Sequence, residues 1–115
     1  MVKENQKRFL LQAIQAIDRL LLFNREHSLE EALEDFRISD VFLMEFENLA
    51  NAVMKLDDEL IAIDPKIPLL QLKGIRNRIA HDYIIVSIEI LFEVINKDLS
   101  NLRIQLSNLL FFIDK

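Results

Sequence analysis

Arg76 and His81 stand five positions apart in the run RNRIAHDY, residues 76–83, and their side chains have complementary chemistry. A neutral imidazole can take the proton from a ribose 2′-hydroxyl as a general base. A guanidinium can hold a phosphate through paired hydrogen bonds and stabilise the negative charge that grows on it, a task for which lysine is a poor substitute. The pair therefore predicts phosphodiester cleavage without a metal ion. Because only RNA has the 2′-hydroxyl, the predicted substrate class is RNA.

A helix through this run would place Asn77 and His81 on one face, since they are four residues apart. Asn77 could then support catalysis by holding the imidazole or the phosphate. Arg76 would lie about 140° around the helix from His81. A long arginine side chain or a distorted helix end could close that gap, but two copies of the helix could also pool their polar faces across a two-fold axis. We therefore expect a homodimer.

The same residues also have an interpretation without chemistry. Arg76 could extend along the surface with its charge in water, His81 could be exposed, and Tyr83 could be an ordinary tyrosine at the edge of the core. An arginine and a histidine five residues apart occur by chance in many helices. The spacing alone does not decide between these interpretations.

Composition limits the other possible classes of protein. The 115 residues fit a single domain, 1–115. The chain has no cysteine and only two histidines, so neither a metal site nor a cofactor is expected. It has no apolar stretch long enough to span a membrane and no signal-peptide pattern, which favours a cytoplasmic location. The net charge is −5. Residues 65–81 nevertheless contain four basic side chains and no acidic one, and such a local positive charge would favour contact with a phosphate.

Helical spacing of apolar residues runs through nearly the whole chain and predicts an all-α fold, an up-and-down bundle of four to five helices. The expected elements before the motif are a helix over residues 3–23, a short helix that Ser28 and Glu31 open with a capping box, and a long helix to about residue 63 that Ser39 or Asp40 caps. After a break at residues 64–68 come the motif helix of about sixteen residues and a C-terminal segment, with joints near Ser87 and residues 98–100. The long helix carries a seam of apolar residues in steps of four and three: Phe42, Phe46, Leu49, Val53, Leu56, Leu60 and Ile63.

The run from Arg76 to Tyr83 resembles the signature of HepT-type toxins in the HEPN superfamily, an arginine, four residues, a histidine, any residue and a tyrosine. The resemblance extends over almost the whole chain. It includes the proline-rich break from Pro65 to Pro68, Gly74 ahead of the motif, and Asp98 with Leu99 in the last segment.

The resemblance implies a helical dimer with its active site at the dimer interface and ribonuclease activity, with tRNA as a target class. It implies a partner, a minimal nucleotidyltransferase of the MntA type, which acts as antitoxin by attaching AMP to the motif tyrosine. Carried onto this sequence, Arg76 and His81 are catalytic, Asn77 is a supporting residue and Tyr83 is the modification site.

The sequence departs from the family pattern at two places in the long helix. Relatives often have an arginine near the position of Met44, and a glycine–glutamate pair where this chain has Ala50 and Asn51. Two other functions remain open. One is an adaptor of the same fold that docks a nucleotidyltransferase and presents Tyr83 without cutting RNA. The other is a helical dimer with no chemistry. The intact pair of Arg76 and His81 favours the ribonuclease, since an adaptor would not need both.

Overall fold

The computed structural model describes residues 2–81 and 84–114, and within those ranges it contains helices and no strand. The all-α fold class is therefore confirmed. In chain order the helices are α1 (Val2–Glu26), α2 (Leu29–Glu34), α3 (Phe36–Met54), α4 (Asp58–Ile61), α5 (Leu69–His81), α6 (Ile84–Lys97) and α7 (Leu99–Ile113). These seven described segments exceed the predicted four to five because α4 is a separate piece where the long helix was expected to continue, and because the C-terminal segment is divided into α6 and α7. Within the same ranges no helix combines the length and the apolarity needed to cross a bilayer.

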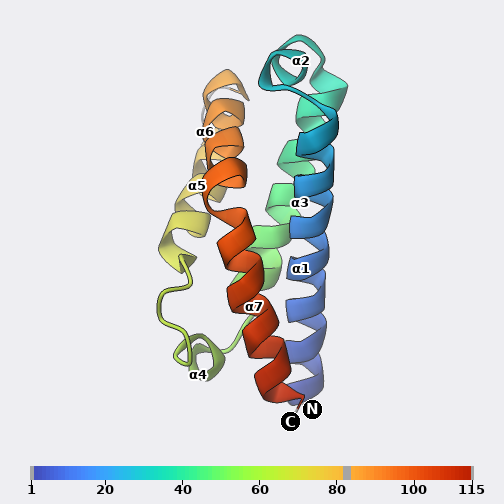
Figure 1. Ribbon diagram of the computed structural model, residues 1–115. Coiled ribbons are helices and arrows are strands. Elements are labelled where there is room, and N and C mark those ends of the chain that lie inside the picture. The colour runs from blue at the N-terminus through green and yellow to red at the C-terminus, as the bar shows by residue number, and fades with distance from the viewer. Residues whose placement is uncertain (1, 82–83, 115) are drawn as a thin grey trace.

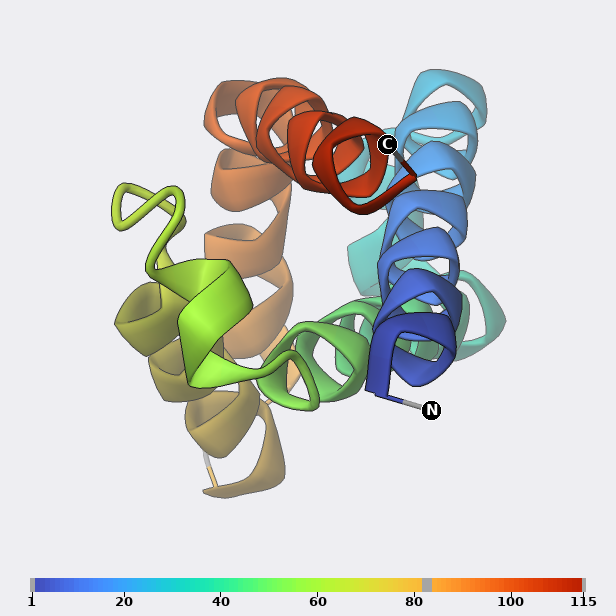
Figure 2. The same cartoon turned by 90° about the horizontal axis from the view of Figure 1, so that it is seen from below.

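The long helices alternate in direction and form a bundle (Figure 1). In that view α1 runs upward, α3 downward and α5 upward, and α6 and α7 return to the end where the chain begins. Seen from below, α1, α3, α5 and the α6–α7 pair surround a common centre (Figure 2). The bundle measures 46 × 27 × 23 Å, so it is elongated along the helices. In this arrangement α3 contacts α1 on one side and α5 on the other.

Aromatic rings on three helices fill one end of the core. The ring of Phe42 lies 4.8 Å from that of Phe23 on α1 and 4.7 Å from that of Phe92 on α6, measured between centroids. Such tilted pairs are favourable beyond the area that they bury. Every residue of the predicted seam from Phe42 to Leu60 is buried, whereas Ile63 is 46% exposed. The apolar face was therefore predicted correctly almost to its end.

The predicted start of α3 was wrong. Asp35, rather than Ser39 or Asp40, caps the helix, since its carboxylate accepts a hydrogen bond of 3.0 Å from the backbone N–H of Arg37. Ser39 lies inside α3 and is buried, and its hydroxyl donates to the carbonyl oxygen of Phe36. A serine can satisfy its hydroxyl on the preceding turn in this way, so it need not mark a helix end.

The predicted end of α3 was also wrong, because the helix stops at Met54 and not near Ile63. The buried side chain of Gln6 from α1 occupies the break. Its amide oxygen accepts a 2.7 Å hydrogen bond from the backbone N–H of Asp57, and its amide nitrogen donates to the carbonyl oxygen of Lys55. This amide therefore provides partners for backbone groups that a continuous helix would have paired internally.

Ser28 and Glu31 form the predicted capping box at the start of α2. The Ser28 hydroxyl accepts from the backbone N–H of Glu31, and the Glu31 carboxylate accepts from the backbone N–H of Ser28. That bond is the main reason that the pKa of Glu31 lies below its ordinary value, and a hydrogen bond from His27 adds to it. The cap turns the chain from α1 into the short connection toward α3.

The second half of the chain follows the prediction in part. The break near residues 98–100 is confirmed, since α6 ends at Lys97 and α7 begins at Leu99. The joint near Ser87 was wrong, because Ser87 lies within α6. The described part of the motif helix, α5, covers the 13 residues Leu69–His81, and the remainder of the predicted helix falls on residues 82–83, outside the described residues.

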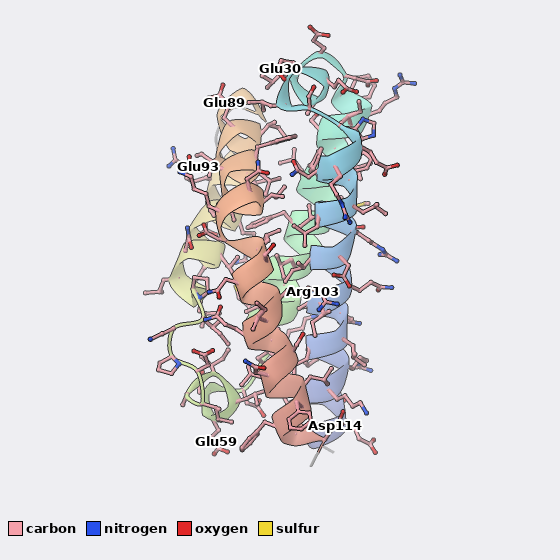
Figure 3. All side chains as sticks on the ribbon, in the orientation of Figure 1. Glu30, Glu59, Glu89, Glu93, Arg103 and Asp114 are labelled. Carbon is pink, nitrogen blue, oxygen red and sulfur yellow. The ribbon has the colours of Figure 1, made fainter. Side chains whose placement is uncertain are left out.

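Charged side chains tie α7 to α1 along the outside of the bundle (Figure 3). The Arg103 guanidinium donates to both carboxylate oxygens of Asp18, at 2.6 and 3.1 Å. This contact raises the pKa of Arg103 above its ordinary value. At the end of the molecule where the chain begins, Lys7 and Asp114 form an ion pair of 3.1 Å. Exposed pairs of this kind contribute little to the stability of the fold.

We expect Phe46→Ala to lower the free energy of unfolding by about 3–5 kcal/mol, because it leaves a cavity in a closely packed core. The Phe46 side chain is fully buried, whereas Phe36 on the same helix is 71% exposed. Phe36→Ala is the matched control and should change stability by less than about 0.5 kcal/mol. Urea denaturation followed by circular dichroism measures both variants. Equal effects would contradict this assignment of the core.

Candidate active site

Helix α5 presents the face to the core that the sequence predicts. Leu72 and Ile75 are buried and Ile79 is half-buried against the core. Asn77 is exposed, as its position on the opposite side requires. The apolar residues anchor α5 against its neighbours α3 and α6 and so determine where the polar residues of the motif point.

Arg76 lies at the boundary between these two faces and is half-buried. Its Nη1 atom donates a 3.2 Å hydrogen bond to the side-chain oxygen of Asn51 on α3. A guanidinium has five N–H donors, so this bond leaves others to meet a ligand. The partner is a neutral amide rather than a carboxylate, so the contact orients Arg76 without neutralising its charge. Such an arginine is well suited to bind a phosphate.

Asn51 was not predicted as part of the site. It appeared in the sequence only as the residue where relatives often have the glutamate of a glycine–glutamate pair. The signal that could have found it is its setting, because Asn51 interrupts the otherwise apolar run LANAV, residues 49–53. Its two neighbours, Ala50 and Ala52, are buried, while Asn51 itself is half-buried. A polar residue at such a position usually has a specific partner.

The structure brings Arg76 to Asn51, but it does not describe every residue of the predicted site. Asn77 points away from the α3–α5 contact into an exposed position. His81 is the last residue of α5, and its side chain lies outside the described part of the structure. Tyr83, the predicted modification site, also lies outside the described residues. The roles of His81, Asn77 and Tyr83 therefore remain predictions.

The outward face of α5 has an unusual composition. Leu70 is 84% exposed, and a Cβ atom built on Gly74 would meet nothing within 4 Å. Steps of four, three and four residues separate Leu70, Gly74, Asn77 and His81. These four positions therefore lie along one side of α5. An exposed leucine next to a bare glycine gives a surface on which a second backbone can lie closely.

Helix α3 carries a second line of residues with the same spacing, on the side away from its apolar seam. It consists of Met44, Asn48 and Asn51, and it continues to Lys55, the residue that caps the end of the helix. Met44 is 55% exposed, so an arginine at that position in relatives would lie on the line that contains Asn51. This chain has a neutral side chain there. Among the described residues, no group of three or more histidine, cysteine, aspartate or glutamate side chains could hold a metal ion.

Fold and site together define an all-helical protein with an oriented arginine at the edge of an exposed polar helix face. Comparison with known proteins identifies the family within this class. The family model described as "Ribonuclease HepT-like" matches residues 11–109. The chain therefore belongs to the HepT-like ribonuclease family, and the resemblance stated from the sequence is confirmed.

Individual relatives agree with this assignment at low identity. A protein of Thermococcus cleftensis described as a probable ribonuclease HepT is 22% identical over 102 residues, which are 89% of this chain and 93% of the relative. A candidate RNase of Methanocaldococcus jannaschii is 24% identical over 84% of this chain and 81% of its own length. A candidate RNase of Caldanaerobacter subterraneus is 28% identical over 72% of this chain and 74% of its own. No solved structure gives a significant match.

Proposed function

We propose that this protein is a metal-independent endoribonuclease, the toxin of a type VII (HEPN/MNT) toxin–antitoxin system, and that it cleaves RNA, with tRNA as the target class. Family membership supports ribonuclease activity at the level of the family. The observation that carries the proposal for this chain is the hydrogen bond between Arg76 and Asn51, which orients a cation at the motif without neutralising it. An unoriented surface arginine would support the interpretation without chemistry.

In the proposed reaction, His81 takes the proton from the 2′-hydroxyl next to the cleaved bond. The 2′-oxygen then attacks the phosphorus, and the bond from phosphorus to the 5′-oxygen breaks. The leaving oxygen takes up a proton to become a 5′-hydroxyl, and the other product ends in a 2′,3′-cyclic phosphate. Arg76 binds the phosphate and stabilises the charge that grows on its oxygens. Asn77 supports the imidazole or the phosphate by hydrogen bonding.

We further propose that the active form is a homodimer in which the α5 helices of the two copies face each other. Leu70 and Gly74 support this arrangement, because they are exposed on the stripe that leads to Asn77 and His81. Leu70 would lose its contact with water, and Gly74 would allow the two backbones to approach. A two-fold axis there would let Arg76 of one copy meet His81 of the other.

The proposed regulator is a minimal nucleotidyltransferase of the MntA type that attaches AMP to Tyr83. The proposal for Tyr83 rests on the family resemblance and on its place two residues after His81 in the sequence. The toxin would meet both its RNA substrate and this antitoxin in the cytoplasm.

Cleavage is expected to continue when divalent metal ions are removed with EDTA, because the proposed chemistry needs only the imidazole and the guanidinium. The products should carry a 2′,3′-cyclic phosphate on one fragment and a 5′-hydroxyl on the other. Gel electrophoresis of end-labelled tRNA, with phosphatase treatment to identify the ends, measures both features. Activity that is lost with EDTA and restored by magnesium, or fragments with a 5′-phosphate, would refute the mechanism.

A further inference from the structure

A groove of about 310 Å³ lies between α1 and α3, beside the arginine of the proposed active site. The residues that line it are Gln12, Gln15, Ala16, Arg19, Glu45, Asn48, Asn51, Ala52 and Lys55. Asn51 is a wall of this groove and is also the partner of Arg76. The groove and the candidate active site therefore share this residue.

The shape of the groove follows from the spacing of small and long side chains. Ala16 on α1 and Ala52 on α3 are both nearly buried. Longer polar side chains stand on either side of this pair, one turn away along each helix. The hollow therefore has small residues at its floor and hydrogen-bonding groups on its walls.

The buried carboxylate of Glu45 contacts two of the side chains that form the walls of the groove. The side chain of Glu45 is only 9% exposed, and one of its oxygens lies 3.6 Å from Nη1 of Arg19. Its other oxygen accepts a 3.2 Å hydrogen bond from the side-chain nitrogen of Asn48. The carboxylate thus compensates the charge of Arg19 and orients the Asn48 amide, whose oxygen stays available as an acceptor.

The charge of the groove is positive on a protein whose net charge is −5. Arg19 and Glu45 cancel each other, which leaves Lys55 in the groove and Arg76 at its edge as the net cations. An anionic group is therefore the favoured ligand. The amides of Gln12, Gln15 and Asn48 add donors and acceptors of the kind that contact the edges of bases in RNA.

We propose that this groove binds a nucleotide that flanks the cleaved phosphate in a single-stranded part of the RNA. Lys55 contacts its phosphate, and the amides contact its base. The volume is at the low end of the roughly 300–1,000 Å³ of small-molecule sites, which suits one nucleotide rather than a helix. This inference rests on the proposed ribonuclease function and adds to it a substrate subsite outside the motif.

The test uses full-length protein with the His81→Ala change, so that RNA binds without being cut. Fluorescence anisotropy with a labelled single-stranded RNA decamer gives the association constant over a series of potassium chloride concentrations. Lys55→Gln should reduce the slope of log affinity against log salt by about 0.7, the value for one phosphate contact on single-stranded nucleic acid. Lys97→Gln on α6 is the matched control. Lys97 is exposed and forms an ion pair with Glu93, and its removal should leave the slope unchanged.

A second measurement separates the subsite from the chemistry. With His81 intact, Lys55→Gln should raise KM for the decamer but leave cleavage of a dinucleotide, which has no flanking phosphate, unchanged. Binding curves for Lys55→Gln that match those of the parent would refute the subsite and leave the ribonuclease proposal intact. A parent that neither binds nor cleaves RNA would refute both. Dissociation of a dimer by Lys55→Gln, seen by light scattering, would instead identify the groove as an interface between copies and would also overturn the proposal.

Discussion

His81→Ala and Arg76→Ala are each expected to reduce the rate of RNA cleavage by a factor of about 10²–10⁴, the effect typical of losing a general base or a principal charge-stabilising group. Growth inhibition on expression should disappear with the activity. Arg76→Lys should restore little, because an ammonium cannot reproduce the paired hydrogen bonds of a guanidinium. Rates are measured with the same end-labelled RNA for all three variants.

The stability of each variant distinguishes one that no longer folds from one that folds but has lost its catalytic group. Arg76 is half-buried and donates a hydrogen bond to Asn51 on the neighbouring helix, a contact whose loss should cost about 0.5–1.5 kcal/mol of stability. Thermal melting should therefore show folded variants at the assay temperature. Full cleavage by either alanine variant would contradict the assigned roles and favour the adaptor function.

Mixing the two inactive variants tests whether the site is shared between two copies. If Arg76 of one copy works with His81 of the other, a heterodimer of Arg76→Ala and His81→Ala contains one intact site and one that lacks both residues. After exchange of subunits at equal concentrations, about a quarter of the parent activity should return, since half of the dimers are mixed and each has one of two sites. A mixture that stays inactive while light scattering detects mixed dimers would show that each copy supplies its own pair.

The sequence was informative about features that depend on residues close together in the chain. Helical spacing identified the buried face of α3 from Phe42 to Val53, and it placed Leu72 and Ile75 inward and Asn77 outward on α5. These predictions succeed because burial of a helix face depends mainly on the 3.6-residue period. The capping box of Ser28 and Glu31 succeeded for the same reason, as its partners are three residues apart.

The failures concern polar groups that are satisfied across helices. Gln6 bonds to Asp57, 51 residues away, and this contact accompanies the early end of α3. Arg76 bonds to Asn51, 25 residues away, and this contact adds the residue that sequence analysis missed. Both bonds depend on how far one helix is shifted along its neighbour. The spacing of apolar residues within one helix carries no information about that shift. The partners of such polar groups can therefore be identified only from the three-dimensional structure.

Tyr83→Phe is expected to keep the toxin active even when the nucleotidyltransferase antitoxin is present. The phenylalanine ring retains the size and apolar character of tyrosine, but the hydroxyl that would accept AMP is gone. Cells that express both proteins should therefore grow with the parent toxin and stop growing with the variant. His81→Ala combined with Tyr83→Phe is the control, because it should allow growth whether or not the antitoxin is present.

The physical reason for neutralisation lies in the charge of the added group. AMP on Tyr83 would introduce a phosphate a short distance along the chain from Arg76, which is already oriented by Asn51 and is not neutralised by it. That phosphate can pair with the guanidinium in place of the phosphate of RNA, and its negative charge and bulk repel the substrate. Inhibition then needs no refolding, so modified and unmodified toxin should melt at similar temperatures. Mass spectrometry of the toxin purified after co-expression should find at least one AMP on Tyr83. Neutralisation of Tyr83→Phe as complete as that of the parent would mean that the antitoxin acts by covering the site, and that Tyr83 is not the residue through which it works.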